Sequence, residues 1–226
     1  MYGVFWLACF LYEKSKMSLS QFLYQNRIFL AISGTYVLLA SAIIYLTKQG
    51  DAVLWFDAHH TFVSDLFFKM TTYIGDGIFI VLFLIGLAFR NYRHVIFIGI
   101  SLGINALVVQ QVKHYLNFPR PRKYFWPRED FHFILPPDDV HGDFSFPSGH
   151  SNGAFTLLFC LVIISYKSKK TQIILGLLAI SASISRLVLF QHFLRDTVVG
   201  ASIAIVLTTV LYFIFKQIPF FKKELE

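Results

Sequence analysis

The sequence predicts an all-α membrane protein whose helices form one bundle. Hydrophobic residues make up 56% of the 226 residues, aromatic residues make up 18%, and the mean hydropathy is +0.60. A soluble domain of ordinary composition cannot bury so many apolar side chains in one core. The apolar residues also gather in stretches close to the roughly 20 residues that a membrane-spanning helix needs. We therefore expect a polytopic membrane protein.

Six such stretches predict six transmembrane helices within a single domain that covers residues 1–226. Short polar connections separate them, and no Gly/Ser-rich linker or internal repeat indicates a second domain. The Gly75-Asp76-Gly77 sequence predicts a turn in which Asp76 caps the second span. The predicted spans are residues 28–47, 71–89, 94–112, 146–166, 171–190 and 196–215.

Two segments outside the spans have a different character. Residues 1–16 contain a short apolar run without the basic start or the cleavage pattern of a signal peptide, so we interpret them as an interfacial segment or a start-site extension. The connection after the third span, residues 113–145, mixes aromatic and acidic side chains. That mixture is typical of an amphipathic loop on the outer membrane surface.

The positions of lysine and arginine predict the orientation. Alternate connections are basic, whereas the first intervening loop carries Asp51, Asp57 and Asp65. By the positive-inside rule, both termini are expected in the cytoplasm, with the protein in the cytoplasmic (inner) membrane. The net charge of +7 is attributed to these loops and to anionic lipid; nucleic-acid binding is not expected because the basic residues are divided between both faces. The basic connections carry Lys14, Lys16 and Arg27; Arg90 and Arg93; Lys167, Lys169 and Lys170; and Lys216, Lys222 and Lys223.

Three short blocks at the ends of apolar stretches carry the candidate chemistry. Together they supply three cations, two histidines, one carboxylate, one hydroxyl and a glycine turn that opens a helix. These groups can bind a phosphate and transfer it through histidine. All three blocks fall on the predicted outer face, so the site is expected to open there. The blocks are Lys113-(six residues)-Arg120-Pro121, Pro147-Ser148-Gly149-His150 and Ser185-Arg186-(five residues)-His192-(three residues)-Asp196.

Each block also has an ordinary structural interpretation. Arg186 ends an apolar helix, where an arginine costs about 2.5–3.5 kcal/mol at mid-membrane, so either a bound anion or a side chain reaching the surface is expected. His192 and Asp196 lie four residues apart and share a helical face, so the carboxylate can orient the imidazole, cap the next helix, or do both. Ser148 and Gly149 suit an anion site at a helix start, but also a common turn.

In combination, the three blocks resemble the full signature of the type-2 phosphatidic acid phosphatase family, which also includes glucose-6-phosphatase and the vanadium haloperoxidases. Every motif position is filled within residues 113–196. The six-span layout is also similar to that of the membrane branch of the family. The resemblance implies an integral-membrane enzyme that hydrolyses a lipid phosphate monoester or diphosphate. Undecaprenyl diphosphate, phosphatidylglycerophosphate, phosphatidic acid and lipid A all remain open as substrates.

The same resemblance implies a role for each motif position. His192 would attack phosphorus to form a phosphohistidine, and Asp196 would polarise it. His150 would protonate the leaving oxygen and then activate water, so the two histidines need opposite protonation states and predict a bell-shaped pH profile. The phosphate-binding groups would be Lys113, Arg120, Ser148, Gly149 and Arg186. Ser185 would either support them or serve helix packing.

No metal or other cofactor is expected, because protein cations would do the work of a metal ion. The remaining histidines show no zinc-like spacing and are interpreted as surface or packing residues. They are His59, His60, His94, His114, His132 and His141. Two alternatives stay open: a lipid phosphotransferase that uses the same phosphohistidine but excludes water, and a non-catalytic lipid binder or transporter. The expected partners are the lipid phosphate substrate and membrane lipid.

Overall fold

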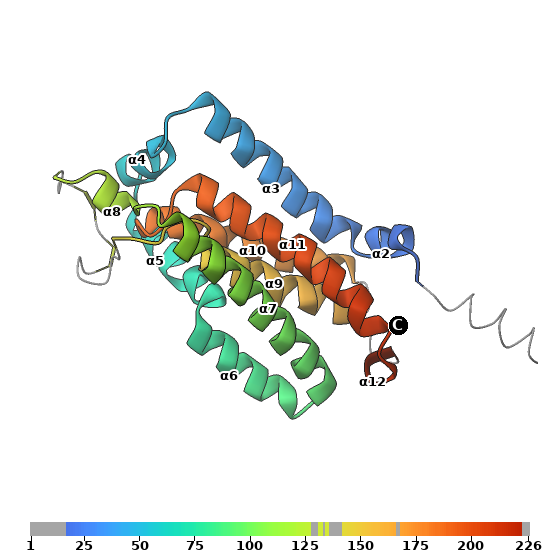
Figure 1. Ribbon diagram of the computed structural model, residues 1–226. Coiled ribbons are helices and arrows are strands. Elements are labelled where there is room, and N and C mark those ends of the chain that lie inside the picture. Colours follow the sequence, from blue (N-terminus) through green and yellow to red (C-terminus); the bar gives the residue numbers. More distant parts are fainter. Residues whose placement is uncertain (1–16, 128–130, 133, 136–141, 166–167, 223–226) are drawn as a thin grey trace, which may run out of the picture.

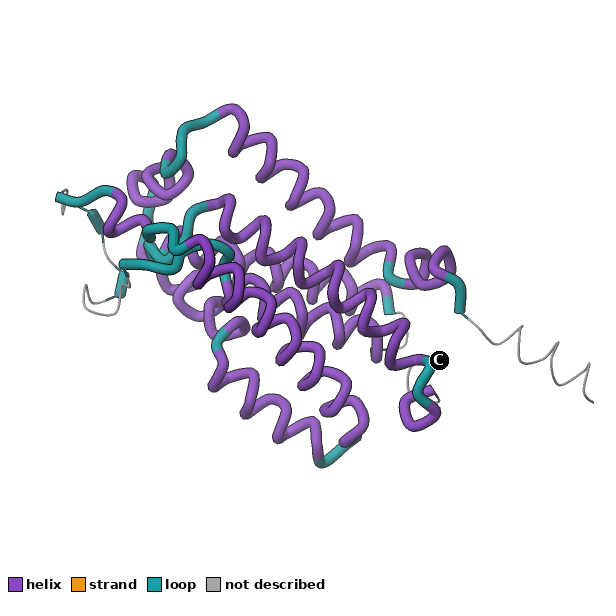
Figure 2. The backbone as a smooth tube through the Cα atoms, viewed as in Figure 1, coloured by secondary structure: helices purple, strands orange, loops and turns teal. Residues whose placement is uncertain are grey.

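The computed structural model describes residues 17–127, 131–132, 134–135, 142–165 and 168–222 (Figure 1). Within these ranges every regular element is a helix and none is a strand (Figure 2). The predicted all-α membrane bundle is therefore confirmed. The expectation for residues 1–16 and most acidic residues of the outer loop fall outside the described residues.

The helices follow one another along the chain with mostly short connections. The first part contains α2 (Leu19–Gln25), α3 (Arg27–Leu46), α4 (Asp51–Ala58), α5 (Phe62–Thr71), the 3-10 helix η1 (Thr72–Gly75), α6 (Gly77–Ala88) and α7 (Tyr92–Leu116). The second part contains α8 (Pro121–Tyr124), α9 (Gly149–Ile164), α10 (Lys169–Val188), α11 (Leu194–Lys216) and α12 (Pro219–Lys222).

A helix occupies each of the six predicted spans, but only four of these helices are both long and apolar enough to cross a membrane alone. Those four are α3, α7, α10 and α11. A fifth span is formed if α5–η1 and α6 are counted together, although their axes bend by 61°. Helix α9 is apolar but has 16 residues. The number of six spans therefore stays a prediction.

The second predicted span differs from the continuous helix that its apolar run suggests. Helix α6 begins only at Gly77, and the Asp76 side chain caps it by accepting hydrogen bonds from the backbone N–H groups of Ile78 (2.9 Å) and Phe79 (3.3 Å). The predicted capping turn is thus present. Just before it, Gly75 lies so close to the His150 carbonyl that a side chain would not fit. The break therefore seats η1 against the start of α9.

Helix α9 forms the centre of the bundle. Ten of its residues are buried, and it packs against α7, α10 and α11 (Figure 1). The Phe159 ring stacks on Phe29 of α3 with centroids 5.0 Å apart and planes 1° from parallel. A helix that is apolar on all sides is buried either by other elements or by lipid, and here other helices cover most of it. This central position holds the N-terminus of α9 in a fixed place.

A chain of hydroxyl groups links three outer helices to the start of α9. The Tyr36 hydroxyl hydrogen-bonds to Thr197 (2.9 Å) and Ser183 (3.2 Å). Ser183 donates to Ser151 (2.9 Å), and Ser151 donates to Ser148 (3.0 Å). Because buried polar groups without partners are costly, such satisfied chains favour one arrangement of the helices.

The contact between α9 and α11 depends on Gly200. A Cβ atom at this position would lie 2.5 Å from the Ser148 carbonyl oxygen, which belongs to the backbone and cannot rotate away. We expect Gly200→Ala to lower the free energy of unfolding by about 1–3 kcal/mol, as overpacking does, in denaturant titrations of the detergent-solubilised protein. Gly103→Ala is the matched control, since a Cβ there meets nothing within 4 Å. Equal stability of the two variants would contradict this packing.

The bundle has two distinct ends. Helices α4, α5 and α8 lie together at one end, whereas α2, α12 and the C-terminus lie at the other (Figure 1). Both ends of the described chain are therefore on the same side of the bundle. This arrangement agrees with an even number of crossings.

Candidate active site

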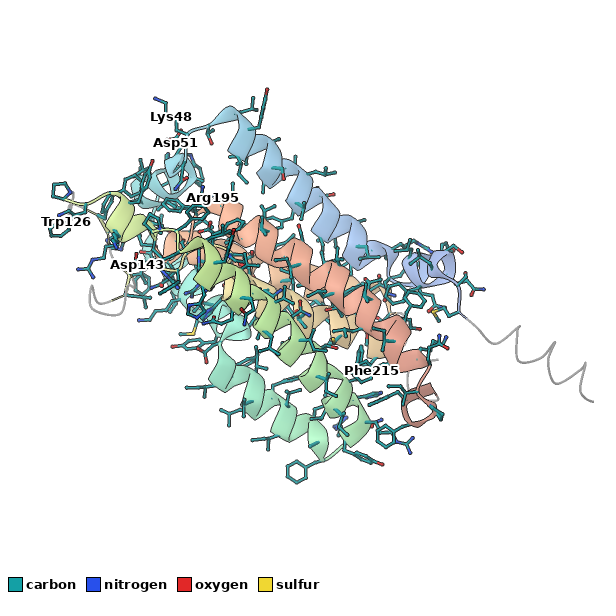
Figure 3. The ribbon with its side chains drawn as sticks, in the orientation of Figure 1. Lys48, Asp51, Trp126, Asp143, Arg195 and Phe215 are labelled. Atoms are coloured by element: carbon teal, nitrogen blue, oxygen red, sulfur yellow. The ribbon has the colours of Figure 1, made fainter. Side chains whose placement is uncertain are left out.

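The three sequence blocks meet at the end of the bundle that carries α4 and α8. Asp143 and Arg195, which flank the site, lie at the same end of the bundle as Trp126, whereas Phe215 lies toward the other end (Figure 3). Each motif residue sits where a helix begins or ends. Lys113 is in the last turn of α7, Arg120 caps α8, Ser148 caps α9, Arg186 is in the last turn of α10, and Asp196 is in the first turn of α11.

His192 lies in the tight connection between α10 and α11. Phe190 takes a left-handed backbone conformation (φ 53°), which turns the chain back. The N–H groups of Gln191 and His192 then both donate to the Arg186 carbonyl, at 2.9 and 3.0 Å. The His192 side chain is left only 1% exposed. One carbonyl thus fixes the candidate nucleophile next to a candidate phosphate-binding cation.

Asp196 is oriented by three hydrogen bonds, one of which its Oδ1 accepts from the Arg195 Nε at 3.4 Å. Its Oδ2 accepts from the Ser145 hydroxyl (2.5 Å) and from the Phe193 backbone N–H (2.9 Å), so the capping role considered from the sequence is present. The Nδ1 atom of His192 lies 3.6 Å from Oδ2 and 3.5 Å from the Ser145 oxygen. The predicted proximity of His192 and Asp196 is therefore observed, with Ser145 beside both.

Arg120 is held from several directions. Its backbone N–H donates to the Gly142 carbonyl (2.8 Å), and its Nε donates to the Asp143 carbonyl (2.8 Å). Its Nη1 donates to the side-chain oxygen (2.7 Å) and the carbonyl (3.1 Å) of Gln191. The side chain is buried, and these neutral partners position its charge without neutralising it.

Arg186 is also buried, yet its polar atoms are only partly satisfied. Its Nη1 donates to the Thr72 hydroxyl at 2.6 Å. Its Nε has no hydrogen-bond partner within the described part of the chain. A buried guanidinium atom without an acceptor is costly unless an anion binds to it.

Lys113 and His150 complete the pocket. A Cβ atom on Gly149 would lie 3.8 Å from the Lys113 Nζ, so the ammonium group stands over the first turn of α9. His150 lies within electrostatic range of the three cations Arg186, Lys113 and Arg120, and also of the His192 ring. The structure therefore brings together all the predicted site residues.

The charges in this pocket do not balance. Three cations surround the imidazoles, and Asp196 is the carboxylate beside His192. Burial, and then the charges of Arg120, Arg186 and Lys113, lower the pKa of His192 well below its ordinary value. The His192 ring is therefore neutral near pH 7, and the pocket as a whole favours a bound anion.

Three residues of the site were not predicted from the sequence. Ser145 orients Asp196, Gln191 holds Arg120, and Thr72 binds Arg186. Ser145 and Gln191 lie close to motif residues in the sequence, so a search for polar neighbours of the blocks would have found them. Thr72 lies 114 residues from Arg186 and carries no local signal.

The fold and the site define a class: polytopic membrane proteins with a buried cluster of cationic and histidine side chains at one end of the bundle. The sequence model of the PAP2 superfamily matches residues 94–219, which is more than half of the chain. The chain therefore belongs to the PAP2 superfamily. A comparison with curated protein sequences finds no match.

Two solved structures are similar to this fold. The crystal structure of LpxE from Aquifex aeolicus has a TM-score of 0.62 and 25% sequence identity, over 73% of this chain and 94% of that one. The PAP2-type phosphatidylglycerolphosphate phosphatase from Bacillus subtilis has a TM-score of 0.62 and 21% identity, over 84% of this chain and 96% of that one. The chain thus has the fold of PAP2-type membrane lipid phosphatases.

Proposed function

We propose that this protein hydrolyses a lipid phosphate monoester or diphosphate through a phosphohistidine on His192, without a metal ion. The observation that carries the proposal is the buried excess of positive charge around a neutral histidine. Such a pocket is complementary to a phosphate whose charge is redistributed during transfer.

The orientation of the His192 ring supports its role as the nucleophile. Its Nδ1 faces Ser145 and Asp196, so a proton on Nδ1 leaves the lone pair on Nε2. In the first step Nε2 forms a bond to phosphorus while the bond to the lipid oxygen breaks. His150 gives its proton to the departing oxygen.

In the second step the roles of the histidines reverse. His150 takes a proton from water, the resulting hydroxide attacks phosphorus, and the bond to His192 breaks to release inorganic phosphate. Lys113, Arg120 and Arg186 would hold the non-bridging oxygens throughout. The Ser148 hydroxyl and the Gly149 N–H would add donors at the start of α9.

The location of the pocket favours a lipid substrate. The site lies at one end of a membrane bundle, so a head group can reach the cations while its chains remain in the bilayer. We place this end at the outer or periplasmic face of the inner membrane, with both termini cytoplasmic. Arg90 and Arg93 support this orientation, because the α6–α7 connection and the first turn of α7 that carry them follow a helix leading away from the site.

The lowered pKa of His192 sets an expectation for the pH profile. Its ring stays unprotonated below the ordinary value of about 6.5, so the acidic limb of kcat/KM should lie below pH 6.5. The profile should be measured with two substrates whose phosphates ionise differently. An acidic limb above pH 6.5 with both substrates would contradict a neutral His192.

The proposed chemistry also predicts resistance to chelators. Because Lys113, Arg120 and Arg186 would stabilise the charge, phosphate release by purified protein should continue in EDTA at saturating substrate. Activity that is abolished by EDTA and restored only by a divalent ion, in the wild type and in His132→Ala alike, would overturn the metal-free mechanism.

The decisive test is phosphate release by the purified full chain across a panel of lipids. Undecaprenyl diphosphate, phosphatidylglycerophosphate, phosphatidic acid and lipid A should each be presented in mixed micelles, alone and with an alcohol-bearing lipid. Free phosphate from at least one lipid supports the proposal. A phosphorylated acceptor without free phosphate would indicate a phosphotransferase, and absence of both would favour a lipid binder.

A further inference from the structure

A second polar cluster lies apart from the three motifs. His60 precedes α5, Asp65 is in its first turn, and His132 belongs to the long connection between α8 and α9. One ligand atom from each residue can be chosen so that all three lie within 4.8 Å of one another. The proposed phosphatase chemistry uses none of these residues.

The distances within the cluster suit a small metal ion. The Asp65 Oδ2 lies 3.0 Å from His132 Nε2 and 3.5 Å from His60 Nδ1. A tetrahedral ion with metal–ligand bonds of about 2.0–2.2 Å separates its ligand atoms by roughly 3.3 Å. The two measured distances bracket that value, and the stacked imidazole rings would have to rotate so that the ion lies in the plane of each ring.

The ligand types point to zinc. Two imidazole nitrogens and one carboxylate oxygen form a common three-ligand zinc set, with water in the fourth position. Magnesium and calcium prefer all-oxygen sites. Both histidines are exposed, so an ion could reach them from solution. We propose that His60, Asp65 and His132 bind one zinc ion.

The surrounding contacts indicate what such an ion would do. The Asp57 Oδ1 accepts the backbone N–H of His132 at 2.8 Å, which already docks this stretch of the loop on α4. The neighbouring Phe131 packs on Phe190, with ring centroids 5.0 Å apart. Phe190 is part of the connection that carries His192. A zinc ion would therefore clamp the outer loop against the α10–α11 connection, which positions His192.

The cluster also has a simpler form without metal. Asp65 can accept hydrogen bonds from protonated nitrogens of both histidines, whose rings stack 3.6 Å apart at 6° from parallel. In that case the cluster would hold the loop without binding an ion. Direct measurement of metal content separates the two forms.

The first experiment is equilibrium dialysis of the full chain, purified in detergent without a polyhistidine tag, against dilute ZnCl₂. Elemental analysis should find about one zinc ion per chain, and MgCl₂ should not compete. His132→Ala and Asp65→Asn should each weaken zinc binding at least about tenfold. His59→Ala is the matched control, since His59 stacks on Trp55 and is outside the cluster.

The second experiment tests whether zinc binding at this cluster stabilises the fold. Zinc should raise the midpoint of thermal unfolding of the wild-type protein and of His59→Ala, but not that of His132→Ala. The proposal is overturned if no stoichiometric zinc binds, or if His132→Ala and Asp65→Asn bind it as the wild type does. Because metal content is measured, the outcome does not depend on the proposed phosphatase activity. An EDTA effect on activity that is absent in His132→Ala would belong to the clamp and not to the chemistry.

Discussion

Replacing His192 with alanine is expected to reduce phosphate release by about 10³-fold or more. The substitution removes the only group placed to form a covalent bond to phosphorus in the proposed mechanism, and His150 acts there as the proton donor instead. The side chain is almost fully buried, so the variant also needs a folding check. Initial rates on the best lipid of the panel, together with size-exclusion profiles in detergent, measure both effects.

His114→Ala provides the control for this variant. His114 is exposed on α7 and its ring nitrogen contacts Gln110 at 2.9 Å, so its loss should leave the rate nearly unchanged. Rapid acid-free quenching with radiolabelled substrate should trap phosphate on the wild type but not on His192→Ala. A folded His192→Ala protein that keeps its activity, or its label, would refute the assignment of the nucleophile.

Replacing Arg186 with alanine should lower kcat by about 10²–10³-fold, the scale found when one transition-state donor is removed. The charge of the guanidinium acts electrostatically on His192, and its Nε has no acceptor in the described structure. Arg186→Lys should restore the charge but not the planar fork, and so give an intermediate rate.

The effect of Arg186→Ala on stability should be small by comparison. Removing one of several like charges from a buried pocket relieves repulsion, which offsets the lost hydrogen bond to Thr72. Steady-state kinetics and thermal unfolding on the same preparation separate the two contributions. If kcat stays within about twofold of the wild type, Arg186 serves packing alone.

The apolar runs were sufficient to predict the helical membrane bundle, because long stretches without charge leave few alternatives. They were less informative about whether each predicted span is one continuous helix. The second run is broken at Gly75 because η1 must approach the His150 carbonyl, and that requirement arises from α9 far along the chain. Similarly, hydropathy alone does not show that α9 is the central helix, since apolar side chains suit lipid and protein surroundings equally.

The site residues were predictable where they belong to a motif whose residue types can bind a phosphate and transfer it. Its supporting contacts were not, because Thr72 and Ser145 act through tertiary hydrogen bonds. The cluster of His60, Asp65 and His132 is the extreme case. His60 and Asp65 are five residues apart, but His132 lies 67 residues from Asp65 and carries no local signal. The docking of the outer loop brings His132 to the other two.

The shortness of α9 has a consequence for where the reaction occurs. Its 16 residues span about 24 Å, whereas the hydrocarbon layer is about 30 Å thick. If its C-terminal end reaches the cytoplasmic interface, Ser148 and Gly149 lie roughly 6 Å beneath the opposite one. A phosphorylated head group must then move below the plane of the neighbouring lipid head groups and lose hydration water before it contacts the cations. The reaction rate should therefore depend on the local thickness of the bilayer.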